Sequence, residues 1–264
     1  MAERKNVNPN FQVKPMRLYE EEVTSIRNLK EGDLVIAKAV SYNNGTVLLT
    51  GDGFDAEMQE TDFNPYCSNE KNEKSMIALI GKKVLARVKK NESDNYLFLE
   101  RESIVRDTYQ LLSEKLGQVI EATVEAILPY ALYIDIGNGI VSMLHVNQVS
   151  VARYYDLSNI FSIGDTIKVK ILNLNLEKGF FEVSRKDAYK KINLEKNSCI
   201  EVICAGTLKD DSGIFIEYDP NNIGIMDIPK NMSSYEFFEG NKVIVSIKGK
   251  NDKGFKANFF WFAE

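Results

Sequence analysis

The stretch GQVIEATVEAILPYALYIDIGNGIVSMLHVNQVS, residues 117–150, contains the clearest alternating pattern of the chain and its single histidine. Apolar residues at positions 132, 134 and 136 alternate with Tyr133 and Asp135, which is the period of a half-buried strand. The turn Gly137-Asn138-Gly139 follows, and these residue types accept positive φ at little cost. A second alternation then places His145 on the side away from the core. The stretch therefore predicts a hairpin with one core face and one face that carries Tyr133 and His145.

The segments on either side of this hairpin continue the strand pattern. The segment SIGDTIKVKILNLNLEKGFFEVSRK, residues 162–186, and the start of the quoted stretch both have the apolar content of short strands. Together they predict five short strands, which is the usual count for a small closed barrel.

Short motifs stand in a fixed order along residues 117–186: YALYI (130–134), MLH (143–145), GD (164–165) and SRK (184–186). Their order and types resemble the RNA-binding domain family first named in ribosomal protein S-one. The pattern of that family has aromatic residues in its second strand, a leucine-leucine-histidine third strand, a glycine-aspartate turn and a closing serine-x-lysine. The resemblance implies an OB-fold barrel that binds single-stranded RNA.

The same pattern recurs before and after the middle region, which gives three repeats of roughly 80 residues each. The predicted fold class is all-β, with three tandem five-stranded OB-fold barrels joined by short helices. The expected parts are an N-terminal arm (1–30), a degenerate first barrel (31–100), a linker helix (101–116), the middle barrel (117–186), a second linker helix (187–196) and a divergent third barrel (197–264).

The outer repeats differ from the middle one at the positions of the aromatic residue and the histidine. Aligned on the middle hairpin, Val47 and Gln59 take these positions in the first repeat, and Phe215 and Asp227 take them in the third. Phe215 is a candidate stacking residue, although Asp227 beside it would repel phosphate. The run FFWF, residues 259–262, is apolar on both sides, which favours barrel core plus contact with a neighbouring domain. The middle repeat alone is expected to keep the aromatic-histidine face.

The resemblance implies that Tyr130, Tyr133 and His145 form the base-stacking surface. Stacking of a base on an aromatic side chain contributes about 1–3 kcal/mol and tolerates any sequence. Tyr133 and His145 have outward parity on adjacent strands. Tyr130 follows a turn signal at Leu128-Pro129, so that either a surface contact or a core position at the barrel end fits it.

Two further groups are candidate RNA contacts with open alternatives. The aspartate and arginine that the family places around its last turn are replaced here by Asn175 and Phe180, with Lys178 nearby. Phe180 could lie on the surface and stack, or in the core. Arg153, followed by the tyrosine pair 154–155, combines a guanidinium with two rings, which suits either a nucleic-acid rim or a packed loop cover.

Composition excludes several function classes. The net charge of −5, from 33 basic and 38 acidic residues, argues against a protein that grips duplex DNA through its phosphates. No apolar run approaches membrane-spanning length, and the first 15 residues lack the apolar segment of a signal peptide. Three cysteines give no paired disulfide framework, which favours a reducing compartment and a cytoplasmic location. One histidine and the absence of a phosphate-cradling motif indicate no catalytic site, metal or cofactor.

The sequence therefore predicts a non-catalytic, cytoplasmic protein that binds single-stranded RNA, and mRNA in particular, mainly through its middle barrel. A role in translation or RNA metabolism follows from the resemblance. The alternative is a protein-interaction module that docks on a ribosome or another RNA-processing complex. Loss of the aromatic face in the outer repeats favours that alternative.

Overall fold

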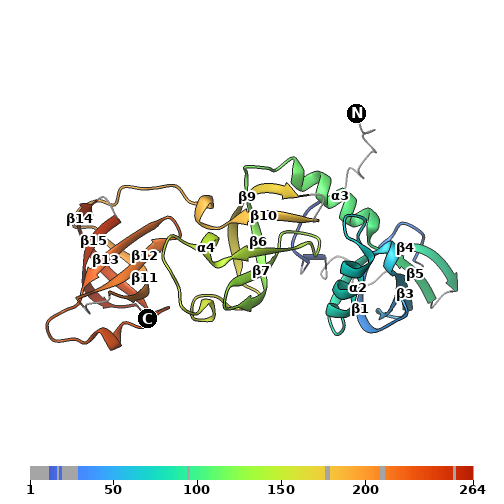
Figure 1. Cartoon of the computed structure of the whole chain (residues 1–264), viewed down its shortest axis with the longest axis horizontal. Helices are drawn as coiled ribbons and strands as arrows, with labels where there is room; N and C mark the ends of the chain where they lie inside the picture. Colours follow the sequence, from blue (N-terminus) through green and yellow to red (C-terminus); the bar gives the residue numbers. More distant parts are fainter. Residues whose placement is uncertain are drawn as a thin grey trace. The chain divides into compact units, whose positions relative to one another are not determined.

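The computed structural model describes residues 12–16, 18–19, 29–93, 96–175, 179–208, 212–251 and 254–263. The chain forms two compact units, whose helices and strands are labelled in Figure 1. One unit comprises residues 1–116 together with 135–141 and 173–181, and the other comprises residues 117–134, 142–172 and 182–264.

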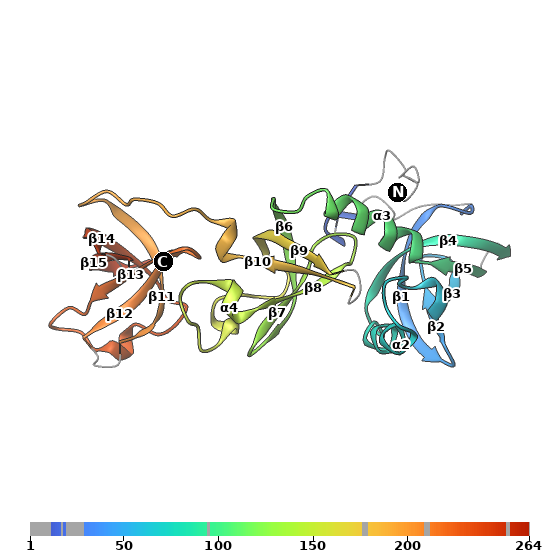
Figure 2. The ribbon, with the colours of Figure 1, turned by 45° about the horizontal axis from the view of Figure 1, so that its top comes forward.

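The first barrel, in the first unit, closes its strands in the order β1-β2-β3-β5-β4. Its strands are β1 Leu34–Asn43, β2 Thr46–Thr50, β3 Asp55–Gln59, β4 Lys83–Ser93 and β5 Tyr96–Glu100. Alternate residues such as Val35 and Ala37 are buried, as the pleat of a strand with one core face requires. Between β3 and β4 the chain forms η1 (Glu60–Asp62) and α2 (Asn69–Ala78), and α2 lies beside the barrel (Figure 2). Met76 of α2 joins the barrel core.

The turn 137–139 has the predicted left-handed backbone, with φ values of 129° at Gly137, 55° at Asn138 and 71° at Gly139. Asp135 holds this turn, because its carboxylate accepts hydrogen bonds from the backbone N–H of Gly137 (2.8 Å) and of Gly139 (3.1 Å). The buried guanidinium of Arg101 donates to the carbonyl of Asn138 at 3.0 Å. Arg101 immediately precedes α3 (Glu102–Ser113), so the helix and the turn are fixed together within the first unit.

The middle strands form a sheet in the order β10-β9-β6-β7-β8. They are β6 Val119–Leu128, β7 Ala131–Asp135, β8 Val141–His145, β9 Thr166–Asn175 and β10 Phe180–Ser184, with α4 (Val146–Val149) and η2 (Leu157–Asn159) between β8 and β9. The order of neighbours is that of the first barrel, with the ring open between β8 and β10. The middle barrel is therefore nearly closed.

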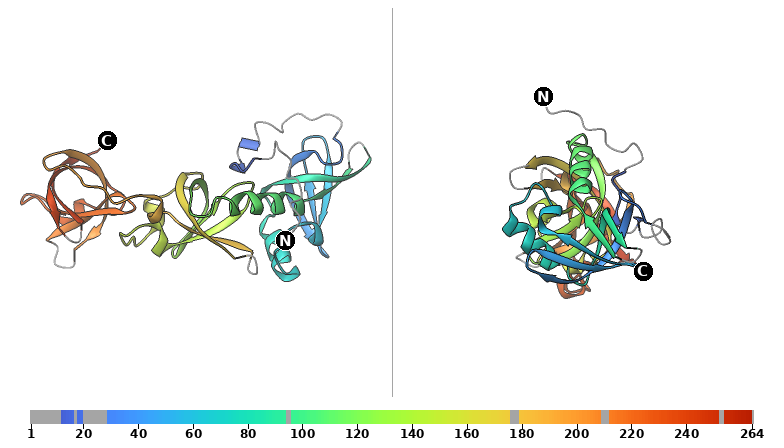
Figure 3. Two further views of the ribbon diagram at one scale, coloured as in Figure 1. Left: turned by 90° about the horizontal axis from the view of Figure 1, so that it is seen from above. Right: turned by 90° about the vertical axis from the view of Figure 1, so that its right-hand side faces the viewer.

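The third barrel, in the second unit, closes in the order β11-β12-β13-β15-β14 (Figure 3). Its elements are β11 Cys199–Thr207, β12 Gly213–Asp219, β13 Asn222–Asp227, η4 Ser234–Glu236, β14 Lys242–Asn251 and β15 Gly254–Phe262. Its core again follows the strand period, with Ile214 and Ile216 of β12 fully buried.

A buried polar network joins the middle and third barrels inside the second unit. Glu217 of β12 is almost fully buried and accepts a short hydrogen bond from the hydroxyl of Ser150. Its other carboxylate oxygen lies 3.4 Å from a guanidinium nitrogen of Arg185. The carbonyl of Pro220 accepts from the N–H of Val151 at 2.9 Å. A buried charge is tolerated when it is paired in this way, so the network fixes how the loop after α4 meets β12.

The predicted fold class is confirmed, since the chain contains three five-stranded barrels of OB type, closed or nearly closed. The expected helix over 187–196 is wrong. One turn of 3-10 helix, η3 (Lys186–Ala188), forms there, and no regular helix or strand follows up to residue 196. Two side-chain amides hold this segment in place. Asn221 donates a hydrogen bond to the backbone carbonyl of residue 189, and Asn222 donates one to the carbonyl of residue 190.

The placing of Val47 at the position of Tyr133 is also wrong. Val47 is fully buried, whereas Leu48 is exposed. The turn after β2 is closed by a hydrogen bond from the N–H of Gly51 to the carbonyl of Phe54 and encloses two residues, whereas the middle turn is closed by one from the N–H of residue 136 to the carbonyl of residue 140 and encloses three. A one-residue shift between turns exchanges the inward and outward faces of a strand.

Candidate nucleic-acid interface

Tyr130 and Tyr133 lie together at the start of β7. Tyr133 is partly buried with outward parity between the buried residues Leu132 and Ile134. Tyr130 belongs to the turn before β7 and is 50% exposed, so the structure resolves its two alternatives in favour of the surface. The two side chains hydrogen-bond to each other, and this bond, together with burial, raises the pKa of Tyr133. The pair therefore presents two neutral rings held side by side.

His145 ends β8, the strand next to β7 in the sheet, and its side chain is exposed. Its Nδ1 accepts a hydrogen bond from the backbone N–H of Asn147 at 3.2 Å. With Nδ1 acting as the acceptor, the neutral ring carries its proton on Nε2. His145 thus offers both a ring face and one outward hydrogen-bond donor.

Met143 extends this face and was not singled out from the sequence. It has the same outward parity on β8 as His145 and is exposed, while Ser142 and Leu144 between and beside them are buried. Parity was the signal that could have found it. A flexible thioether beside aromatic rings provides an adaptable apolar contact for a base.

The loop residues 153–155 were expected to form either a nucleic-acid rim or a packed loop cover, and the structure contains both kinds of position. Arg153 and Tyr155 are exposed, whereas Tyr154 is buried. Burial raises the pKa of Tyr154 strongly, and the nearby negative charge of Glu217 raises it further. Tyr154 therefore packs between the barrels of the second unit, while Arg153 and Tyr155 remain available to a ligand.

The structure describes two of the three candidate residues around the last turn of the middle barrel. Phe180, the first residue of β10, is exposed, and Asn175 at the end of β9 is partly buried. Both belong to the first unit, whereas Tyr133 and His145 belong to the second. Lys178 lies outside the described residues.

In the third barrel the corresponding face is chemically different. Phe215 of β12 is 37% exposed, as outward parity predicts. Asp227 of β13 forms an ion pair with Lys248 of β14 at 2.6 Å. This pairing offsets the repulsion of phosphate that the sequence suggested, but it also engages the lysine.

The aromatic residues of the run 259–262 differ in their surroundings. Phe259 and Phe262 pack on the buried ring of Phe237, with centroids 5.2 and 5.3 Å apart. Phe260, Trp261 and Phe262 are exposed instead of covered by a neighbouring domain. The expectation of a core position therefore holds only for Phe259, which is partly buried against the barrel core.

In the first barrel, Gln59 is exposed at the end of β3, but β2 presents no ring, since Val47 points inward. Nothing on these two strands resembles the tyrosine pair of the middle barrel.

Two further observations limit the chemistry of the described residues. No group of three or more histidine, cysteine, aspartate or glutamate side chains among them is placed to hold a metal ion. None of the helices in the described part of the chain has both the length and the apolar character needed to cross a membrane.

Comparison with known proteins identifies the middle barrel. Residues 114–186 match the family model described as S1 RNA binding domain. The chain is 32% identical over 170 residues to the small ribosomal subunit protein bS1c of Spinacia oleracea, covering 64% of this chain and 39% of that protein. It is 27% identical over 169 residues to bS1 of Synechococcus elongatus, covering 63% and 54% of the two chains.

The similarity also extends beyond the middle barrel. The bS1 protein of Leuconostoc lactis is 26% identical over 218 residues, covering 75% of this chain and 47% of its own. The chain thus spans about half the length, or less, of these relatives. The matched domain includes β6 to β10 with Tyr133 and His145. The middle barrel of this chain therefore matches the S1 RNA binding domain, and the chain is similar to small ribosomal subunit proteins of the bS1 type.

Proposed function

We propose that this protein binds single-stranded RNA, including mRNA, mainly through the outward face of β7 and β8. The observation that carries the proposal is the pair Tyr130 and Tyr133, held together beside exposed His145 on adjacent strands of an S1 RNA binding domain. The relatives are named as small ribosomal subunit proteins, which supports a role in translation.

The chemistry of this face suits unpaired bases. Each exposed ring offers a π-face that contributes about 1–3 kcal/mol per stacked base, whatever the base is. Nε2–H of His145 can donate to a base edge or a phosphate, and exposed Arg153 supplies a positive charge on the same unit. Duplexes do not present their base faces, so the arrangement favours single strands. We also assign Phe180, Lys178 and Phe215 as secondary RNA contacts.

The proposal is tested by replacing Tyr133 and His145 with alanine and titrating a labelled oligoribonucleotide. Loss of two stacking contacts should weaken binding ten-fold or more, while the melting temperature changes little because both side chains face outward. Tyr218→Ala, an exposed tyrosine on β12, is the matched control and should leave the affinity unchanged. Unchanged affinity of the double variant would contradict the proposal.

A second candidate function is docking on a ribosome or another RNA-processing complex through the outer barrels. It is favoured by the first barrel, whose β2 presents no ring, and by the exposed pair Phe260 and Trp261 in the third. Capture of a protein partner that survives RNase treatment, together with no measurable RNA affinity, would support docking over RNA binding.

A further inference from the structure

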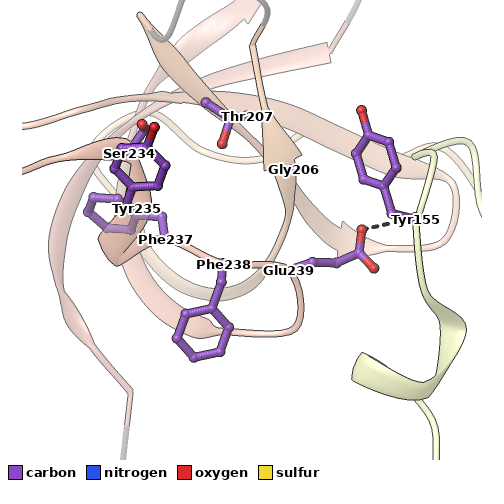
Figure 4. A pocket seen from close by; sticks show the side chains of 8 residues that line it. All are labelled: Tyr155, Gly206, Thr207, Ser234, Tyr235, Phe237, Phe238 and Glu239. Atoms are coloured by element: carbon purple, nitrogen blue, oxygen red, sulfur yellow. Dashed lines mark hydrogen bonds between the residues drawn. The ribbon is translucent and has the colours of Figure 1, made fainter.

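Three exposed aromatic side chains surround one cavity in the second unit. Tyr155 comes from the loop of the middle barrel, and Tyr235 and Phe238 come from the loop between β13 and β14. They are 88%, 90% and 67% exposed. The cavity has a volume of about 310 Å³, at the lower end of the range for small-ligand pockets. Figure 4 shows Tyr155 and Tyr235 on opposite sides of the opening, with Phe238 at its lower edge.

The backbone around these rings is fixed even though the rings are exposed. The carboxylate of Glu239 accepts hydrogen bonds from the N–H of Tyr155 at 2.8 Å and of Asp156 at 2.9 Å. Tyr235 lies in η4, whose start is closed by a reciprocal pair of hydrogen bonds between Ser233 and Glu236. The backbone that carries Tyr155 and Tyr235 is therefore ordered before a ligand binds, which lowers the conformational cost of binding.

Gly206 of β11 forms the back of the cavity and leaves room for a ligand. Its φ of 132° lies in a region that other residues rarely adopt, whereas a Cβ atom there would stand 3.7 Å from the Tyr155 ring, which is an ordinary van der Waals contact. The strand has an irregular register at this point, between Cys204 and Gly206. The backbone conformation therefore favours glycine at this position, and the back of the cavity carries no side chain there.

The lining selects a planar, uncharged group. Among the described residues that line the cavity none is basic, and the polar groups are the hydroxyls of Tyr155, Tyr235, Thr207 and Ser234 and the Glu239 carboxylate. Each carboxylate oxygen has two lone pairs, so that Glu239 keeps acceptor capacity beyond its two backbone partners. A nucleobase fits this set, because it offers a π-face to the rings and N–H donors to the carboxylate. A phosphate does not fit, since it would meet a negative charge.

We propose that this cavity is a second base-binding site for single-stranded RNA, formed where the loop of the middle barrel meets the third barrel. The inference rests on the proposed function, because Tyr155 belongs to residues 114–186, the matched S1 RNA binding domain. Arg153, two residues before Tyr155 on the same loop, is exposed and supplies a positive charge for a nucleotide phosphate. Tyr133, His145 and the cavity belong to the same unit.

The site is tested with the full chain and a 4-thiouridine-substituted oligoribonucleotide of about 30 nucleotides, long enough for two OB folds. Cross-linked peptides should include residues 155, 235 or 238 in addition to the β7–β8 face. Replacing Tyr155, Tyr235 and Phe238 together with alanine should weaken binding about ten-fold and remove the cross-links at these positions. The rings are exposed, so the variant should melt like the wild type, and Tyr218→Ala again serves as the control.

Each outcome has a distinct meaning. Cross-links confined to β7 and β8, with unchanged affinity of the triple variant, would overturn the second site and leave the proposed function intact. No cross-links and no affinity for RNA would overturn both. Capture of a protein that requires the three rings, without cross-links to RNA there, would overturn the assignment of the cavity to RNA.

Discussion

The outward faces of the middle and third barrels differ, although alternate residues of their strands are buried in the core in both. In β7 the buried residues flank outward Tyr133, and in β12 they flank outward Phe215. Beyond that ring the faces diverge, because the middle barrel adds Tyr130 and His145, whereas the third adds an ion pair between Asp227 and Lys248. The barrel constrains inward positions, while outward positions are free to specify what each barrel contacts.

The largest expected effect concerns the buried network that joins these two barrels. Glu217→Ala removes the carboxylate that pairs with Arg185 and accepts from Ser150. Breaking a buried pair leaves an uncompensated charge, so the free energy of unfolding of the second unit should fall by about 3–5 kcal/mol. Urea denaturation followed by circular dichroism measures this change.

The matched control is Glu201→Ala, which removes an exposed ion pair with Lys242 on the same barrel. Surface pairs contribute about 1 kcal/mol or less. Equal destabilisation by both variants would show that the network does not join the barrels.

A smaller effect is expected when the third barrel is made more like the middle one. Asp227→His replaces a negative charge with a ring and releases Lys248 from its ion pair. In a chain that already lacks Tyr133 and His145, this change should raise RNA affinity about five-fold, equivalent to roughly 1 kcal/mol of stacking. Fluorescence anisotropy measures it. No gain would mean that the residue at this position does not determine the difference between the barrels.

The smallest effect is expected from removing one hydroxyl. Tyr130→Phe keeps the ring but deletes the hydrogen bond that raises the pKa of Tyr133. The pKa of Tyr133 should therefore fall towards its ordinary value, as NMR of ring-labelled tyrosine would show, while RNA affinity should change less than about two-fold, because stacking persists. A large loss of affinity would indicate that the hydroxyl, and not the ring, makes the contact.

The sequence predicted the architecture because strand periodicity survives in all three repeats. The prediction failed where the exact number of residues in a turn decides which face of a strand is buried. The position of Val47 was inferred from a glycine turn, but the turn after β2 has another length, and one residue is enough to exchange the faces. The segment 187–196 has an apparently helical pattern, yet hydrogen bonds from Asn221 and Asn222 hold it without helix.

The candidate site was predictable to the extent that it lies on strands. Parity identified Tyr133 and His145 as outward, and it would have identified Met143. Tyr130 could not be placed, because it follows a turn through which parity does not carry. Tyr235 and Phe238 come from a loop without periodicity, so their grouping with Tyr155 around one cavity appears only in three dimensions.

The most direct measurement compares the faces of the two barrels in one experiment. Titration of the isotope-labelled chain with single-stranded RNA, followed by NMR, should shift the backbone signals of β7 and β8 and the imidazole signals of His145. Signals from the faces of β12 and β13 around Phe215 and Asp227 should change much less. Shifts confined to β12 and β13, or no shift on either barrel, would contradict RNA binding by the middle barrel.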